Sequence, residues 1–349
     1  WEGSQDFYRE QIRHGGIYSQ FSENLYPRAF HRAQHGLGER GHKSLATGEP
    51  VSGPDTLSEE ELAANRIDIE RWSLDRTLIS GDFAKRSGHL DKVKVPFLSA
   101  ANWGGHGLHC RGNFEGFLAA ESESKWLEAH GDAHWTHFYT DYGVALQKRF
   151  FGYFLKGEDT GWDTQPRVQL NIRHPGEKFV LRAEHEWPLA RTQWTRYYLD
   201  PASMSLGPSE PVQTDPVTYD ALGHGLLFKT PPLDAPLEIT GPSAVRLTLS
   251  SETSDADVFL VLRLFDPMGK EVTFIGANDP QTPVAQGWLR ASHRKLDPER
   301  SLPYRPYHTH DETWPLDPND PVDLDVEIWP TSIVVPQGYV LGVHLRGCD

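Results

Sequence analysis

Hydrophobic and polar residues follow two different patterns along the chain, and the change falls near residue 190. Before that point, short apolar runs alternate with glycine-rich loops and with stretches of helical spacing, a pattern that favours strands alternating with helices. After it, short apolar runs are separated by turns rich in Pro, Gly and Asp, which is typical of a β-sandwich. The pattern therefore predicts a helical segment over residues 1–94, a βαβ unit over residues 95–190 and an all-β domain over residues 191–349.

The first segment carries two helix signals separated by a long loop. A serine that can act as an N-cap predicts a helix over residues 4–12, which the glycines at 15–16 would end. A second helix is predicted over residues 58–72, because it opens with Ser and Glu in the spacing of a capping box. The loop over residues 36–54 is rich in Gly, His and Pro, and its position favours either a cap over a site or a surface excursion.

The second segment is the one around which the chain is organised. It begins with an apolar run over residues 95–101, which predicts a buried strand, followed by a glycine-rich loop over residues 102–107. A helix with Phe and Leu on one face and a short strand over residues 125–129 complete a βαβ unit, and the strand leads into a histidine-rich loop over residues 130–137. Because loops at the carboxyl ends of parallel strands line the ligand crevice, we expect the glycine-rich and histidine-rich loops to meet there.

The rest of the chain predicts one long helix and then strands. The helix covers residues 142–156, carries an aromatic stripe and is stopped by Gly157. The predicted strands are 167–173, 178–182, 194–199, 226–229, 245–250, 258–265, 272–275, 324–328 and 339–345. Pro and Gly lie mostly between these strands, as expected for connections.

Composition and charge exclude several classes of protein. With 349 residues the chain is long enough for two domains, and its mean hydropathy of −0.55 is typical of a soluble protein. A net charge of −15 disfavours nucleic acid and anionic membranes as partners. Two cysteines, Cys110 and Cys348, are too few for a disulfide framework and favour a reducing, cytoplasmic compartment. Because the chain begins without Met and stops directly after a predicted core strand, we expect it to be part of a longer polypeptide.

Histidines and a cysteine in the βαβ unit raise the question of a metal site. The residues with suitable spacing are His106, His109, Cys110, His130, His134 and His137. Gly131 and Asp132 interrupt the helix that would place the last three histidines on one face, and glycines interrupt the first group in the same way. We therefore expect these histidines to be hydrogen-bonding or packing groups, and we predict neither a metal nor a cofactor.

Nucleophilic catalysis is the second chemistry to consider. An α/β-hydrolase carries its nucleophile on G-x-S-x-G, followed by an acid after one strand and a histidine after a later one. The strand over residues 95–101 leads to the place of the acid, and the strand over residues 125–129 leads to the place of the histidine. The sequence contains no G-x-S-x-G.

Long stretches of the chain, in order, resemble one family. The stretches are 95–117, 125–143, 147–173, 239–267, 287–297 and 334–347, of which VPFLSAANWGGHGLHCRGNFEGF and KWLEAHGDAHWTHFYTDYG are the first two. They are similar to the C-terminal two thirds of the cocaine esterase / X-prolyl dipeptidyl-peptidase (CocE/NonD) family of serine hydrolases. The resemblance implies an α/β-hydrolase portion with a helical cap over residues 1–190, followed by a jelly-roll β-sandwich domain over residues 191–349.

The resemblance also implies an activity and a set of site residues. Members of the family hydrolyse ester or amide bonds, some releasing X-Pro dipeptides, so a small-molecule ester or amide is the expected substrate. His134 falls at the position of the triad histidine, and His137 is the second choice. Gly105 stands where the family has its aspartate, and glycine cannot orient an imidazole. Either Asp132 or Glu115 takes the role of the acid, or this branch of the family catalyses hydrolysis without an acid, or the protein is not a hydrolase.

The family's nucleophile would lie in an N-terminal part outside residues 1–349, so this chain alone is expected to be inactive. An incomplete parallel sheet leaves an unpaired edge, which predicts association with the missing part or with a second copy of the chain. The alternative is a non-catalytic binding or accessory protein that uses the jelly-roll domain. Four aromatic residues favour that alternative if they are exposed, namely Trp288, Tyr304, Tyr307 and Trp314.

Overall fold

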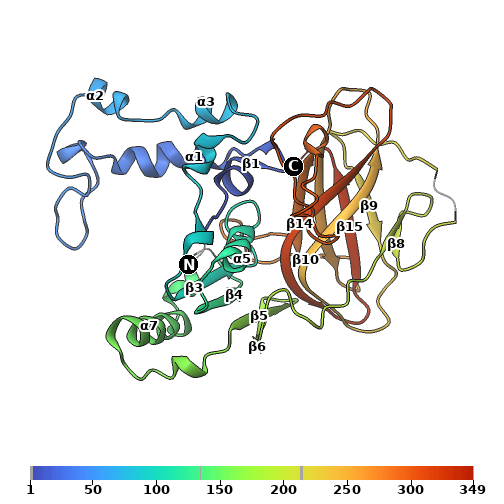
Figure 1. Cartoon of the computed structure of the whole chain (residues 1–349). Helices are drawn as coiled ribbons and strands as arrows, with labels where there is room; N and C mark the ends of the chain where they lie inside the picture. Colours follow the sequence, from blue (N-terminus) through green and yellow to red (C-terminus); the bar gives the residue numbers. More distant parts are fainter. Residues whose placement is uncertain (1–2, 134, 213–214, 349) are drawn as a thin grey trace.

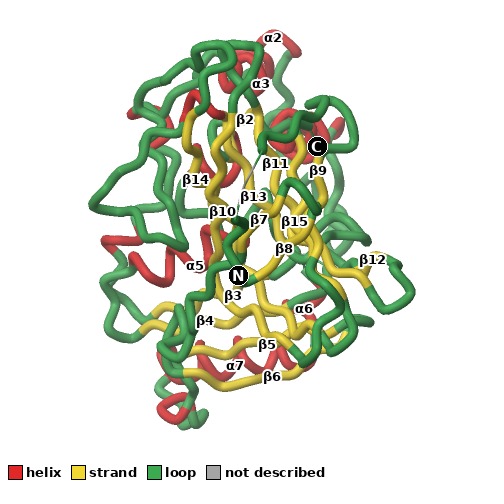
Figure 2. Tube along the Cα trace, turned by 90° about the vertical axis from the view of Figure 1, so that its right-hand side faces the viewer, coloured by secondary structure: helices red, strands yellow, loops and turns green. Residues whose placement is uncertain are grey.

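The computed structural model describes residues 3–133, 135–212 and 215–348. Two bodies are apparent in Figure 1: a smaller one built on a four-stranded sheet and a larger one built on a curled nine-stranded sheet. Figure 2 shows the strands of the smaller sheet running across one end of the larger one. Among the described residues, no helix combines the length and the apolar character that crossing a membrane would require.

The N-terminal segment consists of short helices and one hairpin. A π-helix (η1, Tyr8–Ile12) leads into strands β1 (Arg13–His14) and β2 (Ile17–Tyr18), which pair in an antiparallel hairpin. The remaining elements are α1 (Phe21–Leu25), η2 (Tyr26–Phe30), η3 (His31–Ala33), η4 (Gly38–Arg40), α2 (Glu59–Ala64), α3 (Ile69–Leu74), α4 (Gly81–Ala84) and η5 (Leu90–Lys92). Figure 1 shows α2 and α3 lying away from the smaller sheet.

Two helix predictions in this segment need correction. The predicted helix over residues 4–12 is helical only from Tyr8, because the backbone amides of Gln5 and Asp6 donate instead to the buried Glu10 carboxylate, at 2.7 and 2.9 Å. Gly15, with a φ of 55°, turns the hairpin rather than ending a helix.

The capping box of Ser58 and Glu61 is present as predicted, but α2 ends at Ala64. The predicted helix over residues 58–72 is therefore two helices rather than one. Asp68 accepts a hydrogen bond from the backbone amide of Arg71 and so caps α3 as a separate helix.

The smaller sheet contains the predicted βαβ unit. Its strands are β3 (Phe97–Asn102), β4 (Lys125–His130), β5 (Val168–His174) and β6 (Lys178–Glu184), in that spatial order. The first three are parallel and β6 is antiparallel to β5. Helix α5 (Cys110–Ala119) connects β3 to β4, and α6 (Thr136–Tyr139), α7 (Asp141–Lys156) and η6 (Trp162–Thr164) lie between β4 and β5.

Neighbouring residues of β4 pack on opposite faces of this sheet. Leu127 belongs to a core that includes Phe114 and Phe117 of α5, whereas Trp126 packs with Phe150 of α7. Both faces of β4 are therefore covered, as in the parallel strands of sheets that carry helices on both sides. Helix α7 begins one residue before the predicted start, with Thr140 as its N-cap, and ends as predicted before Gly157, which adopts the left-handed conformation.

The larger sheet holds nine strands within the described residues. Its strands are β7 (Tyr198–Asp200), β8 (Ser205–Gly207), β9 (Leu226–Lys229), β10 (Leu237–Leu249), β11 (Asp257–Phe265), β12 (Glu271–Val272), β13 (Ala285–Arg290), β14 (Val322–Val335) and β15 (Val340–Arg346), with η7 (Ala291–His293) after β13. Eight of them follow the order β10-β14-β13-β11-β15-β9-β8-β7, and β12 pairs with β11. Sequence patterning missed β8 and β13. Gly287 breaks the apolar run of β13, yet its missing side chain is what lets β14 approach, because a Cβ there would lie 2.1 Å from the Glu327 carbonyl oxygen.

One buried hydrophobic cluster contains residues of both bodies. Trp329 of β14 belongs to the same buried cluster as Phe114 of α5, and Val334 packs against that cluster. Gly104, in the turn after β3, lies against Gly276 of the larger body, and a Cβ on Gly104 would be 2.4 Å from the Gly276 Cα. The larger body is therefore packed directly against the ends of the parallel strands.

Candidate active site

Strands β3 and β4 end side by side, and the loops that follow them are tied together. Asn102 and His130 are register partners at the ends of the two strands, and the Trp103 amide donates to the His130 carbonyl at 2.7 Å. The Asn102 side chain donates to the carbonyl of Asp132 at 2.8 Å and accepts from the amide of Gly104 at 2.7 Å. The two loops therefore meet as predicted, with Asn102 joining them.

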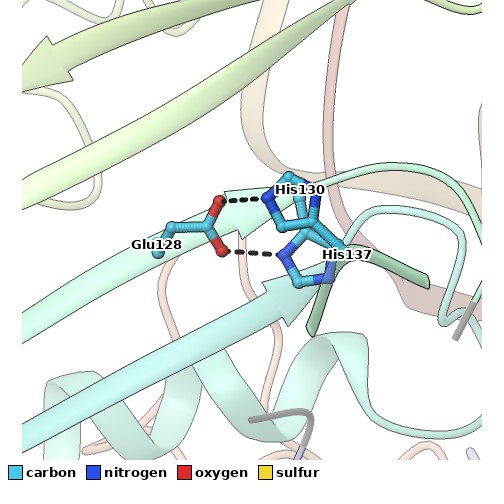
Figure 3. A group of neighbouring side chains, drawn as sticks. All are labelled: Glu128, His130 and His137. Atoms are coloured by element: carbon cyan, nitrogen blue, oxygen red, sulfur yellow. Dashed lines mark hydrogen bonds and ion pairs between the residues drawn. The ribbon is translucent and has the colours of Figure 1, made fainter. Parts of the chain in front are cut away.

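A buried carboxylate with two histidines lies at the end of β4 (Figure 3). Glu128 Oε2 accepts a hydrogen bond from His130 Nδ1 at 2.7 Å, and Oε1 lies 3.5 Å from His137 Nε2. The side chains of Glu128 and His130 are 1% and 0% exposed, whereas that of His137 is 17% exposed. His137 is therefore the member of this group that is most accessible to a reacting molecule.

The carboxylate is charged at neutral pH. Burial raises the pKa of the Glu128 carboxyl, but the charge and hydrogen bond of His130, together with those of His137, outweigh burial and hold that pKa below its usual value. The Asn171 side-chain amide donates a further hydrogen bond to Oε1 at 3.0 Å. Glu128 is thus a fixed negative charge beside two imidazole rings.

These three residues also have the donor types of a metal site. Their ligand atoms all lie within 4.8 Å of one another. The two imidazole rings, however, are stacked nearly parallel, at 12° with centroids 4.3 Å apart. A nitrogen lone pair lies in the plane of its ring, so one ion cannot meet both lone pairs in this arrangement, and the 2.7 Å contact has the length of a hydrogen bond. The geometry suits proton transfer better than metal binding.

The residues predicted from the sequence occupy different surroundings. His134 lies outside the described residues. Asp132 adopts a φ of 71°, and its carboxylate accepts from the adjacent Ala133 amide at 2.6 Å. Glu115 is paired with Arg305 of the larger body at 2.8 Å.

Gly105, at the expected position of the acid, is buried in a tight turn, where its carbonyl accepts from the amides of residues 108–110 at 3.1 Å each.

His106 and Cys110 lie at the junction between the two bodies, whereas His109 contacts the N-terminal segment. His106 Nδ1 accepts from the backbone amide of Gln286 at 3.2 Å, and burial lowers the pKa of His106 to about 3. Cys110 Sγ donates to the carbonyl of Pro330 at 3.4 Å. His109 Nδ1 lies 3.4 Å from the Ser4 hydroxyl.

Sequence reasoning missed Glu128. The signal was present, because a glutamate in the middle of the apolar stretch Trp-Leu-Glu-Ala is a charge placed in a buried strand, and buried charges need partners. The family pattern places the acid in the loop after a strand, whereas this carboxylate lies within the second strand.

Comparisons with known proteins find relatives of this chain among hydrolases and esterases. Residues 160–349 match the family described as X-Pro dipeptidyl-peptidase C-terminal non-catalytic domain. Proteins of Mycobacterium bovis and Mycobacterium tuberculosis that carry serine esterase in their names are each 29% identical over 244 residues, covering 58% of this chain and 35% of theirs. The chain thus spans about a third of the length of these relatives.

A crystal structure of a CocE/NonD family hydrolase from Staphylococcus aureus is 28% identical, with a TM-score of 0.85, and the match covers 100% of this chain and 59% of that one. An α-amino acid ester hydrolase matches at a TM-score of 0.66 and 15% identity over 98% of this chain and 63% of that one, a similarity of fold. The chain belongs to the X-Pro dipeptidyl-peptidase C-terminal domain family, and it looks like a C-terminal portion of the CocE/NonD family.

Proposed function

We propose that this chain is part of a serine hydrolase that cleaves ester or amide bonds through a Ser-His-acid mechanism, with the serine supplied from outside residues 1–349. The observation that carries the proposal is the histidine-rich loop after β4, which lies against the end of β3 and beside a buried carboxylate. A histidine supported in this way can take the proton of a serine hydroxyl during attack on a carbonyl and return it to the leaving group.

The base in this proposal is a histidine of that loop, with His134 and His137 as the candidates. The parallel strands β3, β4 and β5, covered by α5 and α7, would be the C-terminal part of an α/β-hydrolase sheet, and residues 1–94 would form its helical cap. The larger body would be a jelly-roll domain against one side of the site. Its contact with the turn after β3, through Gly276 and Gly104, supports a role in shaping the pocket for the substrate.

The second candidate is a non-catalytic binding protein, which the description of the matched C-terminal family as non-catalytic favours. Most of the aromatic residues predicted to form the binding surface pack against other side chains of the chain. Tyr307 is buried, Trp288 packs on Trp329 with ring centroids 5.3 Å apart, and Tyr304 stacks on Trp194. Of the four aromatic residues named for this function, Trp314 alone is exposed, so the hydrolase is the better-supported candidate.

Fluorophosphonate labelling tests the proposal directly, because the reagent reacts with activated serine hydroxyls. We would express residues 1–349 alone and together with the coding sequence upstream of Trp1, and measure labelling and hydrolysis of p-nitrophenyl acetate. The extended polypeptide should be labelled and active, and the 349-residue chain should be neither. Extended protein that folds but is not labelled would show that the hydrolase proposal is wrong and would favour the binding protein.

A further inference from the structure

We infer that Glu128 is the positioning carboxylate of this site, acting through His137 in place of the acid that the turn after β3 does not carry. The inference rests on the proposed hydrolase function and deepens it, because it assigns the acid and selects His137 as the base. It places the acid within strand β4, immediately before the histidine loop, rather than after the preceding strand.

The contacts of Glu128 fix the direction in which its oxygens point. Oε2 accepts from His130 Nδ1 at 2.7 Å and Oε1 accepts from Asn171 Nδ2 at 3.0 Å. These two bonds hold the carboxylate so that Oε1 faces His137 Nε2 at 3.5 Å. This separation is longer than that of a strong hydrogen bond, and catalytic contacts often tighten when substrate binds.

The other carboxylate candidates are less suited to this role. A side chain at Gly105 would crowd the turn, because its Cβ would lie 3.2 Å from the Asn102 carbonyl oxygen and 3.3 Å from the Cys110 amide nitrogen. The Glu115 carboxylate is paired with Arg305. The Asp132 carboxylate accepts from the adjacent backbone amide at 2.6 Å.

The chemistry follows from the direction of the hydrogen bond. A carboxylate facing Nε2 keeps the proton of a neutral His137 on that nitrogen, so Nδ1 is the nitrogen that carries the basic lone pair. When Nδ1 takes the proton of the serine hydroxyl, the negative charge of Glu128 stabilises the imidazolium that forms. His130 stacks on His137 at 4.3 Å between centroids and Tyr142 packs against it at 5.0 Å, so both limit rotation of the ring.

The experiment uses the extended polypeptide and compares matched variants. In Glu128→Gln the charge is lost and the shape is kept, so kcat for p-nitrophenyl acetate should fall by about 10²- to 10⁴-fold, as when a triad acid is neutralised, with KM nearly unchanged. Glu128→Asp should recover part of the lost kcat. Glu184→Gln is the matched control, because Glu184 is a buried carboxylate of the same sheet whose partners are Arg182 and Arg191, and it should keep wild-type kcat.

A double-mutant cycle separates positioning from a general effect on folding. His137→Ala should lower kcat as much as Glu128→Gln or more, and combining the two should cost no more than His137→Ala alone, because the residues act as one unit. If Glu128→Gln does not fold, the comparison of His137→Ala with His134→Ala tests the inference instead. The inference requires that kcat falls further in His137→Ala. Full activity in Glu128→Gln, or a larger loss at Asp132→Asn or His134→Ala, would overturn it. Wild-type protein without labelling or hydrolysis would instead contradict the hydrolase proposal.

Discussion

Two clusters of charged side chains, a strand-end cluster at the end of β4 and a junction cluster between the two bodies, hold carboxylates beside different cations. At the end of β4, Glu128 lies between His130 and His137. At the junction of the two bodies, Glu10 and Glu327 flank Arg111, with oxygens 3.1 and 3.0 Å from its guanidinium nitrogens. Arginine stays protonated at any physiological pH, whereas histidine exchanges its proton near neutrality. We therefore expect the junction cluster to serve structure, and we propose that the strand-end cluster serves chemistry.

The junction cluster connects three segments that are far apart in the sequence. Glu10 comes from η1, Arg111 from α5 and Glu327 from β14. Burial lowers the pKa of Arg111, but the carboxylates around it, with Glu327 the strongest, outweigh burial and hold the pKa above its usual value. Its charge is therefore permanent, and removing it leaves two buried carboxylates without their cation.

Replacing Arg111 by Met should have the largest effect on stability. Breaking a buried ion pair by removing one partner costs about 3 to 5 kcal/mol, because the remaining charges are uncompensated. Urea unfolding followed by tryptophan fluorescence would measure the loss in the free energy of unfolding. A loss below about 1 kcal/mol would show that the cluster is solvated. The junction cluster would then not be a structural ion pair, and the comparison between the two clusters would fail.

Histidines at the junction should make stability fall in acid. His308 lies beside Arg9 and Arg111, with His293 and Asp325 also near it, and burial is the main reason why its pKa is lowered to about 3. A histidine with a lowered folded pKa contributes stability that is present above its unfolded value of 6.5 and is lost as the pH falls toward 3. Between pH 6.5 and 5 this amounts to about 2 kcal/mol for one group.

His308→Gln should therefore lose less stability between pH 7 and pH 5 than the wild-type protein does, by about 2 kcal/mol. Urea unfolding at several pH values would measure the two slopes. Because Gln is neutral and polar, the difference between the slopes reports the imidazole itself. Equal slopes would mean that the pKa of His308 in the folded protein is close to its unfolded value.

Glu128→Gln should cost less stability than Arg111→Met. Imidazole, unlike guanidinium, can lose its proton near neutral pH, so the variant should lose hydrogen bonds without leaving an isolated ion, at a cost of about 1 to 2 kcal/mol. Urea unfolding of residues 1–349 at pH 7.5 would test this. A loss as large as that of Arg111→Met would mean that the strand-end cluster is mainly a structural ion pair.

Local signals predicted more of this molecule than long-range ones. The strands β3 and β4, the helix α7 ending at Gly157 and the capping box at Ser58 were all predicted, because each depends on residues adjacent in the chain. Strand β13 was missed, since Gly287 resembles a turn until β14 is seen packed against it.

The candidate site shows the same difference between local and long-range signals. The meeting of the two loops followed from strand order, and the histidine loop was identified from its composition. The role of Glu128 depends on His130, Asn171 and His137 lying around it, and the Arg111 cluster joins residues more than 100 positions apart. Nothing in local patterning identifies which of many charged residues will meet across the fold.

Arg246→Met should have the smallest effect, and it tests whether burial rather than charge explains the comparison. Arg246 also faces two carboxylates, those of Asp323 and Asp325 at 3.5 and 3.8 Å, but its side chain is 70% exposed. Water and salt screen such pairs, and the long side chain loses conformational freedom in forming them, so the free energy of unfolding should change by less than about 0.5 kcal/mol. Urea unfolding at low and at high salt would measure it beside Arg111→Met. If the two arginines cost the same, burial would not be what makes the junction cluster strong, and the contrast between arginine and histidine clusters would need another cause.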